Sequence, residues 1–325
     1  MYLIHIMELL YIILVFVVVC ILYFHIIYQY KVSEDLEIYE MDYKDNASLQ
    51  ETCNINQPVI FDRGPFELPN LRSCKQILNV KDINDYYKGL DSVDSVELPC
   101  ESVIDLLNKD EKSCYFTENN EIFIDESGLH KQITKLDTEL KPKYAFYTKY
   151  DILMGSKNCT TPFRYHTKSR KFLYVARGTD VRIKMASWKY TKYLQEIKDY
   201  ENLDFKSNLN VWINNETDKD LDKIQFLEFV VPVGFILSIP SYWWYSIKYE
   251  ESETVIIEYN YTSLINNLAH TCHFAKFYLQ QRNTIKHFSN SVKLFNFETN
   301  KQRDSFSENS SCIITDKQVL ESGVL

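Results

Sequence analysis

The sequence predicts a mainly β domain with flanking helices, of the α+β kind, behind one N-terminal membrane-spanning helix. Hydrophobic residues make up 45% of the 325 positions, enough for a sizeable core. Tyr (24) and Phe (19) are abundant whereas Gly (7) and Pro (8) are scarce, which favours strands over forced turns. Several short β-branched and aromatic segments follow one another, with helix-like segments before and after them. This order is typical of a β-sandwich or jelly roll decorated by helices.

The first 30 residues predict a membrane anchor. Leu9–Tyr28 contains no Asp, Glu, Lys or Arg, and about 20 such residues suffice to cross the hydrocarbon core. A cleaved signal peptide would have a basic start, a shorter apolar core and a small-residue cleavage site, and none of these is present. Lys31 and Lys44 follow the span and slightly favour a cytosolic main domain. We therefore expect a single-pass membrane protein.

Charge and cysteine content argue against nucleic-acid binding, a disulfide framework and a structural zinc site. The formal net charge is −9 without a long run of one sign, so we expect no nucleic-acid partner. Outside the apolar segment the cysteines are odd in number and include no C-x-x-C pair, which favours free thiols. His270, Cys272 and His273 form an H-x-C-H run, but no complementary pair lies nearby to complete a zinc site. Asn-X-Ser/Thr sequons keep a lumenal location open as an alternative. They lie at Asn46, Asn158, Asn215, Asn260 and Asn309.

The remaining chain divides into three segments. Residues 31–56 are polar and acidic and predict a stalk, 57–288 predict the folded domain, and the polar residues 289–325 predict a loose tail. Within the domain, apolar spacing predicts helices at 73–87 and 102–108, and one helix or two from 263 to about 287. A short strand is expected near residue 57. Further strands are expected at 143–154, 172–176, 181–185, 226–239 and 254–261.

One run carries a specific resemblance. Ile239–Ile247 reads IPSYWWYSI and resembles the cupin and JmjC jelly-roll oxygenases, most closely their asparaginyl-hydroxylase-like branch. Weaker similarities occur in the matching order at QPVIFDRGPF, Thr160–Met185 and Phe205–Trp212, so the resemblance covers roughly Gln57–His287. It implies a double-stranded β-helix, the cupin jelly roll, for the domain at 57–288.

The resemblance also implies that the metal site is vestigial. An active member binds Fe(II) through H-x-D/E and a distal His, leaving positions for 2-oxoglutarate and oxygen. Tyr245 stands at the distal His position. One register places Arg164 and His166 at the first two ligand positions, and the other places His166 and Lys168 there. Arg cannot give up its proton and Lys rarely does, so at most His166 remains as a ligand and no metal is expected.

The cosubstrate positions change as well. In the asparaginyl-hydroxylase branch a Lys two residues after the turn glycine pairs with 2-oxoglutarate. Here the turn glycine is Gly178 and Asp180 occupies the Lys position, where it would repel a carboxylate. Arg182 has the right charge two residues further on, and Thr161 is retained. The resemblance thus implies a vestigial cosubstrate site and no cofactor.

These observations predict a membrane-anchored, non-catalytic cupin-like protein that acts as a structural or interaction module with a protein partner. The degenerate pattern is similar to cupin-like proteins of large nucleocytoplasmic DNA viruses, and the Asn-, Ile- and Tyr-rich composition suits such AT-rich genomes. A viral origin would place the chain in a host or virion membrane.

Two alternatives stay open. One is an atypical enzyme, an oxygenase of the Fe(II)/2-oxoglutarate class or a hydrolase, that uses His166 and Tyr245 in a rearranged metal site. The other is a binding module whose barrel mouth holds a small anion or an acidic peptide. A locally basic hairpin would face that ligand. Its cations are Arg164, Lys168, Arg170, Lys171, Arg177, Arg182 and Lys184.

Overall fold

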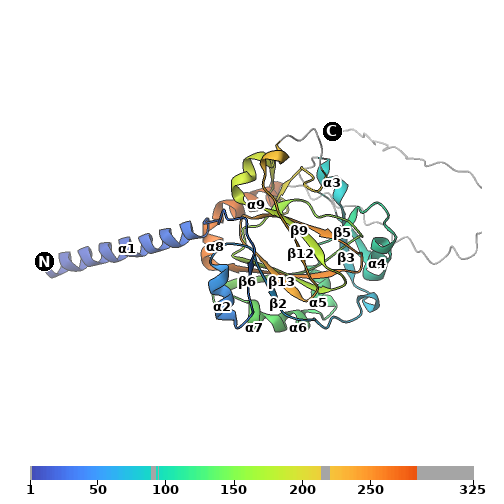
Figure 1. The fold of residues 1–325 in the computed structure, drawn as a ribbon. Helices are drawn as coiled ribbons and strands as arrows, with labels where there is room; N and C mark the ends of the chain where they lie inside the picture. The colour runs from blue at the N-terminus through green and yellow to red at the C-terminus, as the bar shows by residue number, and fades with distance from the viewer. Residues whose placement is uncertain (1, 89–92, 94, 214–219, 284–325) are drawn as a thin grey trace, which may run out of the picture. The chain divides into compact units, whose positions relative to one another are not determined.

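The computed structural model describes residues 2–88, 93, 95–213 and 220–283 (Figure 1). The expected tail at 289–325, the end of the resemblance at His287 and the sequons at Asn215 and Asn309 lie outside these residues. The described part is mostly β, with two largely antiparallel sheets, flanking helices and an apolar N-terminal helix.

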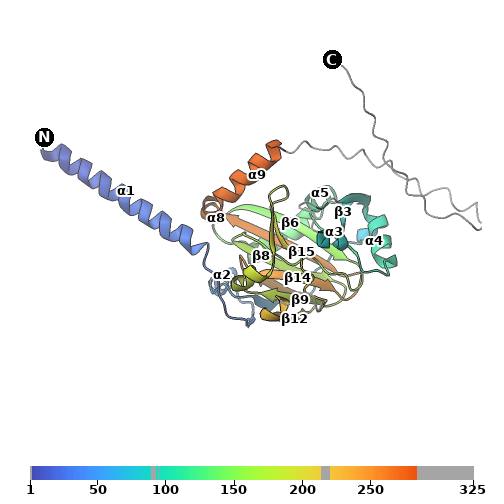
Figure 2. The same ribbon diagram turned by 90° about the horizontal axis from the view of Figure 1, so that it is seen from above.

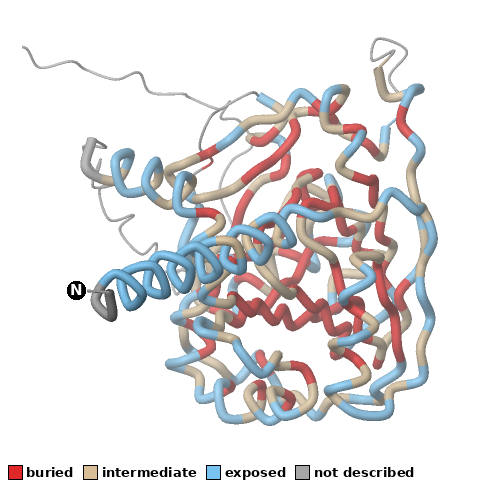
Figure 3. The backbone as a smooth tube through the Cα atoms, turned by 90° about the vertical axis from the view of Figure 1, so that its left-hand side faces the viewer, coloured by how far each residue is buried: buried red, intermediate tan, exposed pale blue. Residues whose placement is uncertain are grey.

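The N-terminal helix α1 (Tyr2–Tyr28) is long and apolar enough to span a membrane. None of its hydrophobic stretch His5–Tyr28 is buried against the protein, and Figure 3 shows the helix exposed along its length. A helix that is apolar on every side has no polar face to present to water.

The larger sheet has nine strands within the described residues. Its order is β1-β2-β13-β8-β15-β6-β5-β3-β4, and only β1 and β2 pair in parallel. The strands are β1 (Tyr39–Glu40), β2 (Val59–Asp62), β3 (Ile77–Asp82), β4 (Val96–Pro99), β5 (Tyr115–Thr117), β6 (Ala145–Gly155), β8 (Arg170–Arg177), β13 (Phe235–Ile239) and β15 (Val255–Ser263).

The smaller sheet has six strands within the same residues, in the order β10-β11-β7-β14-β9-β12. The strands are β7 (Arg164–Tyr165), β9 (Val181–Ala186), β10 (Glu196–Asp199), β11 (Asp204–Ser207), β12 (Leu227–Val231) and β14 (Trp244–Tyr249). Across the described chain no strand of one sheet pairs with a strand of the other, so the sheets do not form a closed barrel. Successive strands from β6 to β9, and again from β12 to β15, alternate between the two sheets. The β10–β11 hairpin, between these two runs, lies entirely in the smaller sheet.

The two sheets share one hydrophobic core. Figure 2 shows β8, β15 and β6 of the larger sheet on one side and β14, β9 and β12 of the smaller sheet on the other. Alternation along a strand sends every second side chain to the same face. On β9, Val181, Ile183 and Met185 enter this core, where they meet Leu173 and Val175 of β8. The core therefore consists of the facing sides of two sheets, as in a sandwich.

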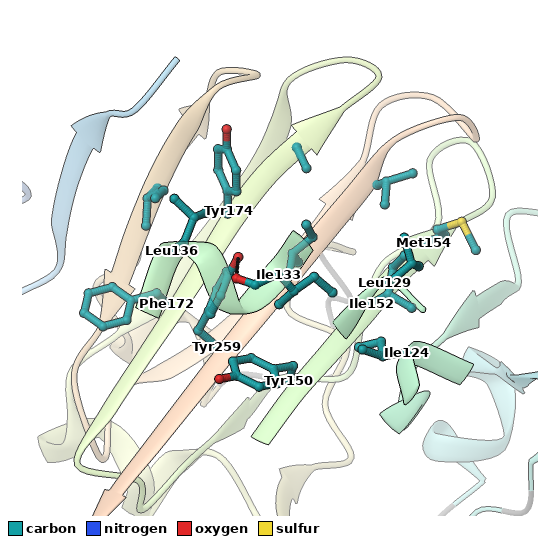
Figure 4. Packing of buried hydrophobic residues seen from close by; sticks show 14 of the residues in the cluster. Ile124, Leu129, Ile133, Leu136, Tyr150, Ile152, Met154, Phe172, Tyr174 and Tyr259 are labelled. Carbon is teal, nitrogen blue, oxygen red and sulfur yellow. Dashed lines mark hydrogen bonds between the residues drawn. The ribbon is translucent and has the colours of Figure 1, made fainter. Parts of the chain in front are cut away.

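Short helices cover the outer face of the larger sheet. Leu129, Ile133 and Leu136 pack over Ile152 and Tyr259 in a second buried cluster (Figure 4). The helices that contribute to this cluster are α2 (Asn46–Cys53), α4 (Cys100–Lys109), α5 (Glu121–Glu126), α6 (His130–Ile133), α7 (Asp137–Leu140) and the 3-10 turns η1 (Leu71–Ser73) and η2 (Thr134–Leu136).

A third buried cluster covers the other side of the smaller sheet, and the two adjacent tryptophans belong to different clusters. Trp243 enters the core between the sheets, whereas Trp244 stacks on Phe163 on the opposite side, and both are fully buried. Tyr190 of η3 (Trp188–Tyr193) and Leu221 of η4 (Leu221–Lys223) also contribute to this side.

Two expectations from the sequence are wrong. Residues 31–56 are not a simple stalk, because β1 pairs with β2 and α2 buries Leu49 and Cys53. Residues 73–87 are not one helix but β3 followed by α3 (Ile83–Tyr87), since Leu78 and Val80 are buried at the two-residue period of a strand.

The other predicted elements have the expected types. The helix expected at 102–108 is α4, and the predicted strands correspond to β2, β6, β8, β9 and β15. The segment expected as one strand at 226–239 is two strands, β12 in the smaller sheet and β13 in the larger. The segment after residue 263 forms two helices within the described residues, α8 (Leu264–Ala269) and α9 (Thr271–Asn283).

Candidate functional site

A cavity of about 430 Å³ brings together four residues singled out from the sequence: Arg164, His166, Lys168 and Tyr245. Strand pairing explains the arrangement. Arg164 of β7 lies directly opposite Tyr245 of β14, and His166 follows two residues after Arg164. The other charged residues of the lining are Lys81, Glu118, Lys149, Asp151, Lys171, Asp199, Asp204, Lys206 and Glu258.

Arg164 is neutralised by a buried carboxylate. Its guanidinium donates to Glu118, and the Lys81 ammonium lies 2.9 Å from the same carboxylate. Burial alone would raise the pKa of Glu118, but Arg164 and Lys81 outweigh it and hold that pKa well below its usual range. Tyr86 donates a further hydrogen bond of 3.1 Å to Glu118. This cluster is closed on itself and offers no carboxylate to a metal.

A second closed cluster contains Tyr245. The Lys171 ammonium lies 2.7 Å from Glu258 and donates a 2.8 Å hydrogen bond to the Tyr245 hydroxyl. Asn260 donates to the same carboxylate at 2.6 Å. Burial would raise the pKa of Glu258, yet Lys171 outweighs burial and lowers it. The Tyr245 hydroxyl, at the position that the resemblance assigns to the distal His, is thus hydrogen-bonded to an ammonium group.

His166 has no free lone pair. The backbone N–H of Lys168 donates to its Nδ1 at 3.2 Å, so Nε2 carries the proton and donates to the Ile239 carbonyl at 3.1 Å. Burial, reinforced by Lys171, lowers the pKa of His166 well below its usual range. The imidazole is therefore neutral, and both of its nitrogens have partners.

These residues do not fit an Fe(II) ion or a 2-oxoglutarate bound to one. The ligand positions hold a paired guanidinium, a fully hydrogen-bonded imidazole and a phenol bound to Lys171. Coordination would require breaking buried ion pairs. The mismatch follows from the donor set itself.

The three cosubstrate positions lie outside the cavity lining. Thr161 accepts a 2.9 Å hydrogen bond from the Ile247 backbone and thereby ties the segment before β7 to β14. Asp180 accepts from the backbone of Val233 at 3.1 Å. Arg182 lies on the outer face of β9, where it pairs with Glu228 and Glu250.

Lys168 is the cation of the cavity left without a carboxylate partner. It makes no ion pair within 4.0 Å among the described residues, whereas its neighbour Lys149 lies 3.4 Å from Glu121. Burial, followed by the charges of Lys149 and Lys171, lowers the pKa of Lys168 to about 8. The carboxylates of Glu258 and Glu121 act in the opposite direction but do not outweigh these effects.

Asp151 and Asn260 also line this site. Asp151 accepts backbone hydrogen bonds from Asn119 and Asn120 at 2.6 and 2.7 Å, while burial and the charge of Glu258 raise its pKa to about 7. Asn260 exposes no surface at its Oδ1, which has no hydrogen-bond partner in the described structure. That oxygen is a buried acceptor without a donor.

The mouth of the cavity is aromatic. Phe274, Phe277 and Tyr278 of α9 line it together with Tyr147 of β6, and Tyr278 and Tyr147 are 68% and 47% exposed. A ligand with a charged end and an apolar body would contact both surfaces.

Sequence analysis did not identify three buried carboxylates of the site, those of Glu118, Asp151 and Glu258. The signal for the last two is a carboxylate inside an apolar strand, as in VIIEYNY and KYDILM, because a charge at a buried position requires a partner. Glu118 lies in an ordinary polar loop and carries no such signal.

The H-x-C-H run has structural partners. His270 bonds to the Tyr242 hydroxyl at 2.6 Å and to the Asn266 carbonyl at 2.7 Å, and His273 contacts Tyr200. Among the residues that the structure describes, no group of three or more His, Cys, Asp or Glu side chains is placed to hold a metal.

Comparison with protein-family models and with curated proteins finds no match for this chain.

Proposed function

We propose that this chain is a membrane-anchored, non-catalytic binding module built on a cupin- and JmjC-like jelly roll. Its cavity would bind a small carboxylate or phosphate, or the acidic end of a peptide, and α1 would anchor it as a single-pass protein. The observation that carries the proposal is the contrast between two closed ion clusters and the unpaired Lys168 in one cavity.

Strand order supports the jelly roll. The strands β6, β15, β8 and β13 are consecutive neighbours in one sheet, and β7, β14, β9 and β12 are consecutive neighbours in the other. Eight antiparallel strands divided between two facing sheets in this way are the framework of a jelly roll. In that framework β7 and β14 are the strands that the resemblance assigns to the metal ligands.

The closed clusters support a non-catalytic role. Arg164 and Tyr245 are directly opposed across β7 and β14, so the two altered ligand positions face each other. Each is held by a buried charged partner, Glu118 for Arg164 and Lys171 for Tyr245. A fold is retained more readily than a site, and scaffolds without catalysis commonly serve in binding.

The anion is supported by charge and by geometry. Lys168 and Lys149 line the same cavity, and Lys168 makes no ion pair in the described chain. A ligand with an anionic oxygen would give Lys168 the counterion that it lacks.

The test is ligand binding by the full chain in nanodiscs. We expect 2-oxoglutarate or inorganic phosphate, used as probes, to bind without turnover, and Lys168→Gln to weaken binding by about tenfold, the effect of losing one charge-assisted hydrogen bond. Lys157→Gln is the matched control, because Lys157 is exposed and pairs with Glu251 at 2.8 Å outside the cavity.

Metal content and turnover separate this proposal from an oxygenase. Stoichiometric Fe, Mn or Zn that is lost on His166→Ala, or consumption of 2-oxoglutarate, would show the non-catalytic assignment to be wrong. Binding that Lys157→Gln weakens as much as Lys168→Gln would contradict the assignment of the anion to this cavity.

A further inference from the structure

A second cavity, of about 920 Å³, lies at the end of α1. Its lining includes Tyr28 in the last turn of α1, Lys31 just after it, and Leu264 at the start of α8. Tyr28 donates a 3.3 Å hydrogen bond to the Asn54 carbonyl, and Tyr30 donates to the carbonyl of Ala269. If α1 crosses a bilayer, these contacts place the cavity at the level where the helix leaves the hydrocarbon core.

The lining of this cavity is basic in an acidic protein. Lys31, Lys141, Lys143 and Arg170 line it, and no Asp or Glu is among the described lining residues. None of the four makes a salt bridge with a described carboxylate. Arg170 donates instead to neutral oxygens, among them Oε1 of Gln50 at 3.1 Å.

Exposed apolar side chains border the same cavity. Tyr144 and Leu264 line it and are 78% and 64% exposed. Phe146, at the start of β6, is 70% exposed and lies two residues after Tyr144. The pairing of Ala145 with Ser263 brings this segment beside the start of α8. Aromatic and aliphatic side chains beside Lys and Arg are typical of the membrane–water interface.

From these observations we propose that the second cavity binds the headgroup of an anionic phospholipid in the leaflet next to the domain. The lipid phosphate would contact Arg170 and Lys143, and the upper acyl chains would lie along Tyr144 and Leu264. The inference rests on the proposed anchoring by α1. A volume of about 920 Å³ falls within the usual range for sites of small organic ligands.

The basic lining of the second cavity and its place at the end of α1 favour an anionic lipid as the ligand. A basic side chain near an anionic lipid surface contributes about fivefold in affinity. Lys31 and Lys143 are exposed and have no carboxylate partner in the described chain, so neutralising both is expected to reduce the preference for anionic lipid about 25-fold without unfolding the domain.

The experiment uses the full chain in vesicles of phosphatidylcholine, with or without phosphatidylserine. Flotation with the phosphatidylcholine vesicles measures the anchor, and native mass spectrometry of chain released from the mixed vesicles measures retained phosphatidylserine. The variant is Lys31→Gln/Lys143→Gln. The control is Lys75→Gln/Lys157→Gln, which changes the net charge equally at exposed lysines outside this cavity.

We expect all three proteins to float, and the wild type and the control to retain phosphatidylserine in preference to phosphatidylcholine. The Lys31→Gln/Lys143→Gln variant should lose most of that preference. Normal flotation without any preference in the wild type overturns the lipid site but leaves the anchor intact, and so does an equal loss in the variant and the control. A chain that does not float overturns the anchor and this site with it.

Discussion

The Lys171–Glu258 ion pair gives the sharpest test of the closed cavity wall. The side chains of Lys171 and Glu258 are 8% and 10% exposed and their charged atoms lie 2.7 Å apart. Replacing Lys171 by Met leaves the carboxylate buried with one remaining donor, Asn260. Removing one partner of a buried pair costs about 3–5 kcal/mol, because the other charge remains without water or a counterion.

That cost corresponds to a fall of about two to three-and-a-half powers of ten in the folding equilibrium constant. Glu258→Gln should cost a similar amount, since it leaves the Lys171 ammonium buried beside a phenol. The double variant Lys171→Met/Glu258→Gln removes both charges, and Gln still accepts from Asn260. Its stability should return to within about 1–2 kcal/mol of the wild type, which corresponds to a coupling energy of about 4–9 kcal/mol between the two side chains.

The assay is denaturant unfolding of the full chain in nanodiscs, followed by the fluorescence of the buried Trp243 and Trp244. Lys157→Met serves as the control, because both partners of its pair are about half exposed and such pairs contribute under about 1 kcal/mol. A loss below about 1 kcal/mol for Lys171→Met, or strictly additive variants, would refute the buried pair.

Three further outcomes follow. Tyr245→His should not produce stoichiometric Fe(II) binding, measured by metal analysis, because the other ligand positions remain occupied by hydrogen-bonded partners. The affinity for the anion, measured by calorimetry, should fall in two steps as pH rises. The first step, near pH 7, is the ionisation of Asp151, and the second, near pH 8, is the loss of the positive charge of Lys168. Asp151→Asn should remove the first step. Gly178→Ala should lower the denaturation midpoint more than Gly128→Ala, because both glycines have positive φ but only at Gly178 would a Cβ lie 2.4 Å from backbone.

The strands could be predicted from the sequence because their side chains follow the period of a sheet. Val181, Ile183 and Met185 enter the core while Arg182 and Lys184 point away from it. The same rule fails for residues 31–56, whose few apolar residues gave no sign that Leu49 would be fully buried. Short helices of this kind are stabilised by packing rather than by their own pattern.

Only some residues of the candidate site could be predicted from the sequence. Arg164, His166 and Tyr245 could be brought together by resemblance to a motif. Their partners Glu118 and Glu258 come from distant segments, and only the folded arrangement shows which carboxylate neutralises which cation. The same limit applies to the second cavity, whose lining residues run from His25 to Ile265.

The two ion pairs also bear on how an oxygenase site could be lost in the proposed jelly roll. A metal site contributes positive charge that its carboxylate ligand balances. Arg164 and Lys171 each bring a permanent charge into the same volume, and each is buried together with one carboxylate, Glu118 or Glu258. Introducing Lys171 or Glu258 alone, or Arg164 without Glu118, would bury an unpaired charge at a cost of about 3–5 kcal/mol, a large part of the stability of a typical domain. The pairs are therefore expected to act as units, and restoring a single ligand such as His at position 245 cannot reverse the change.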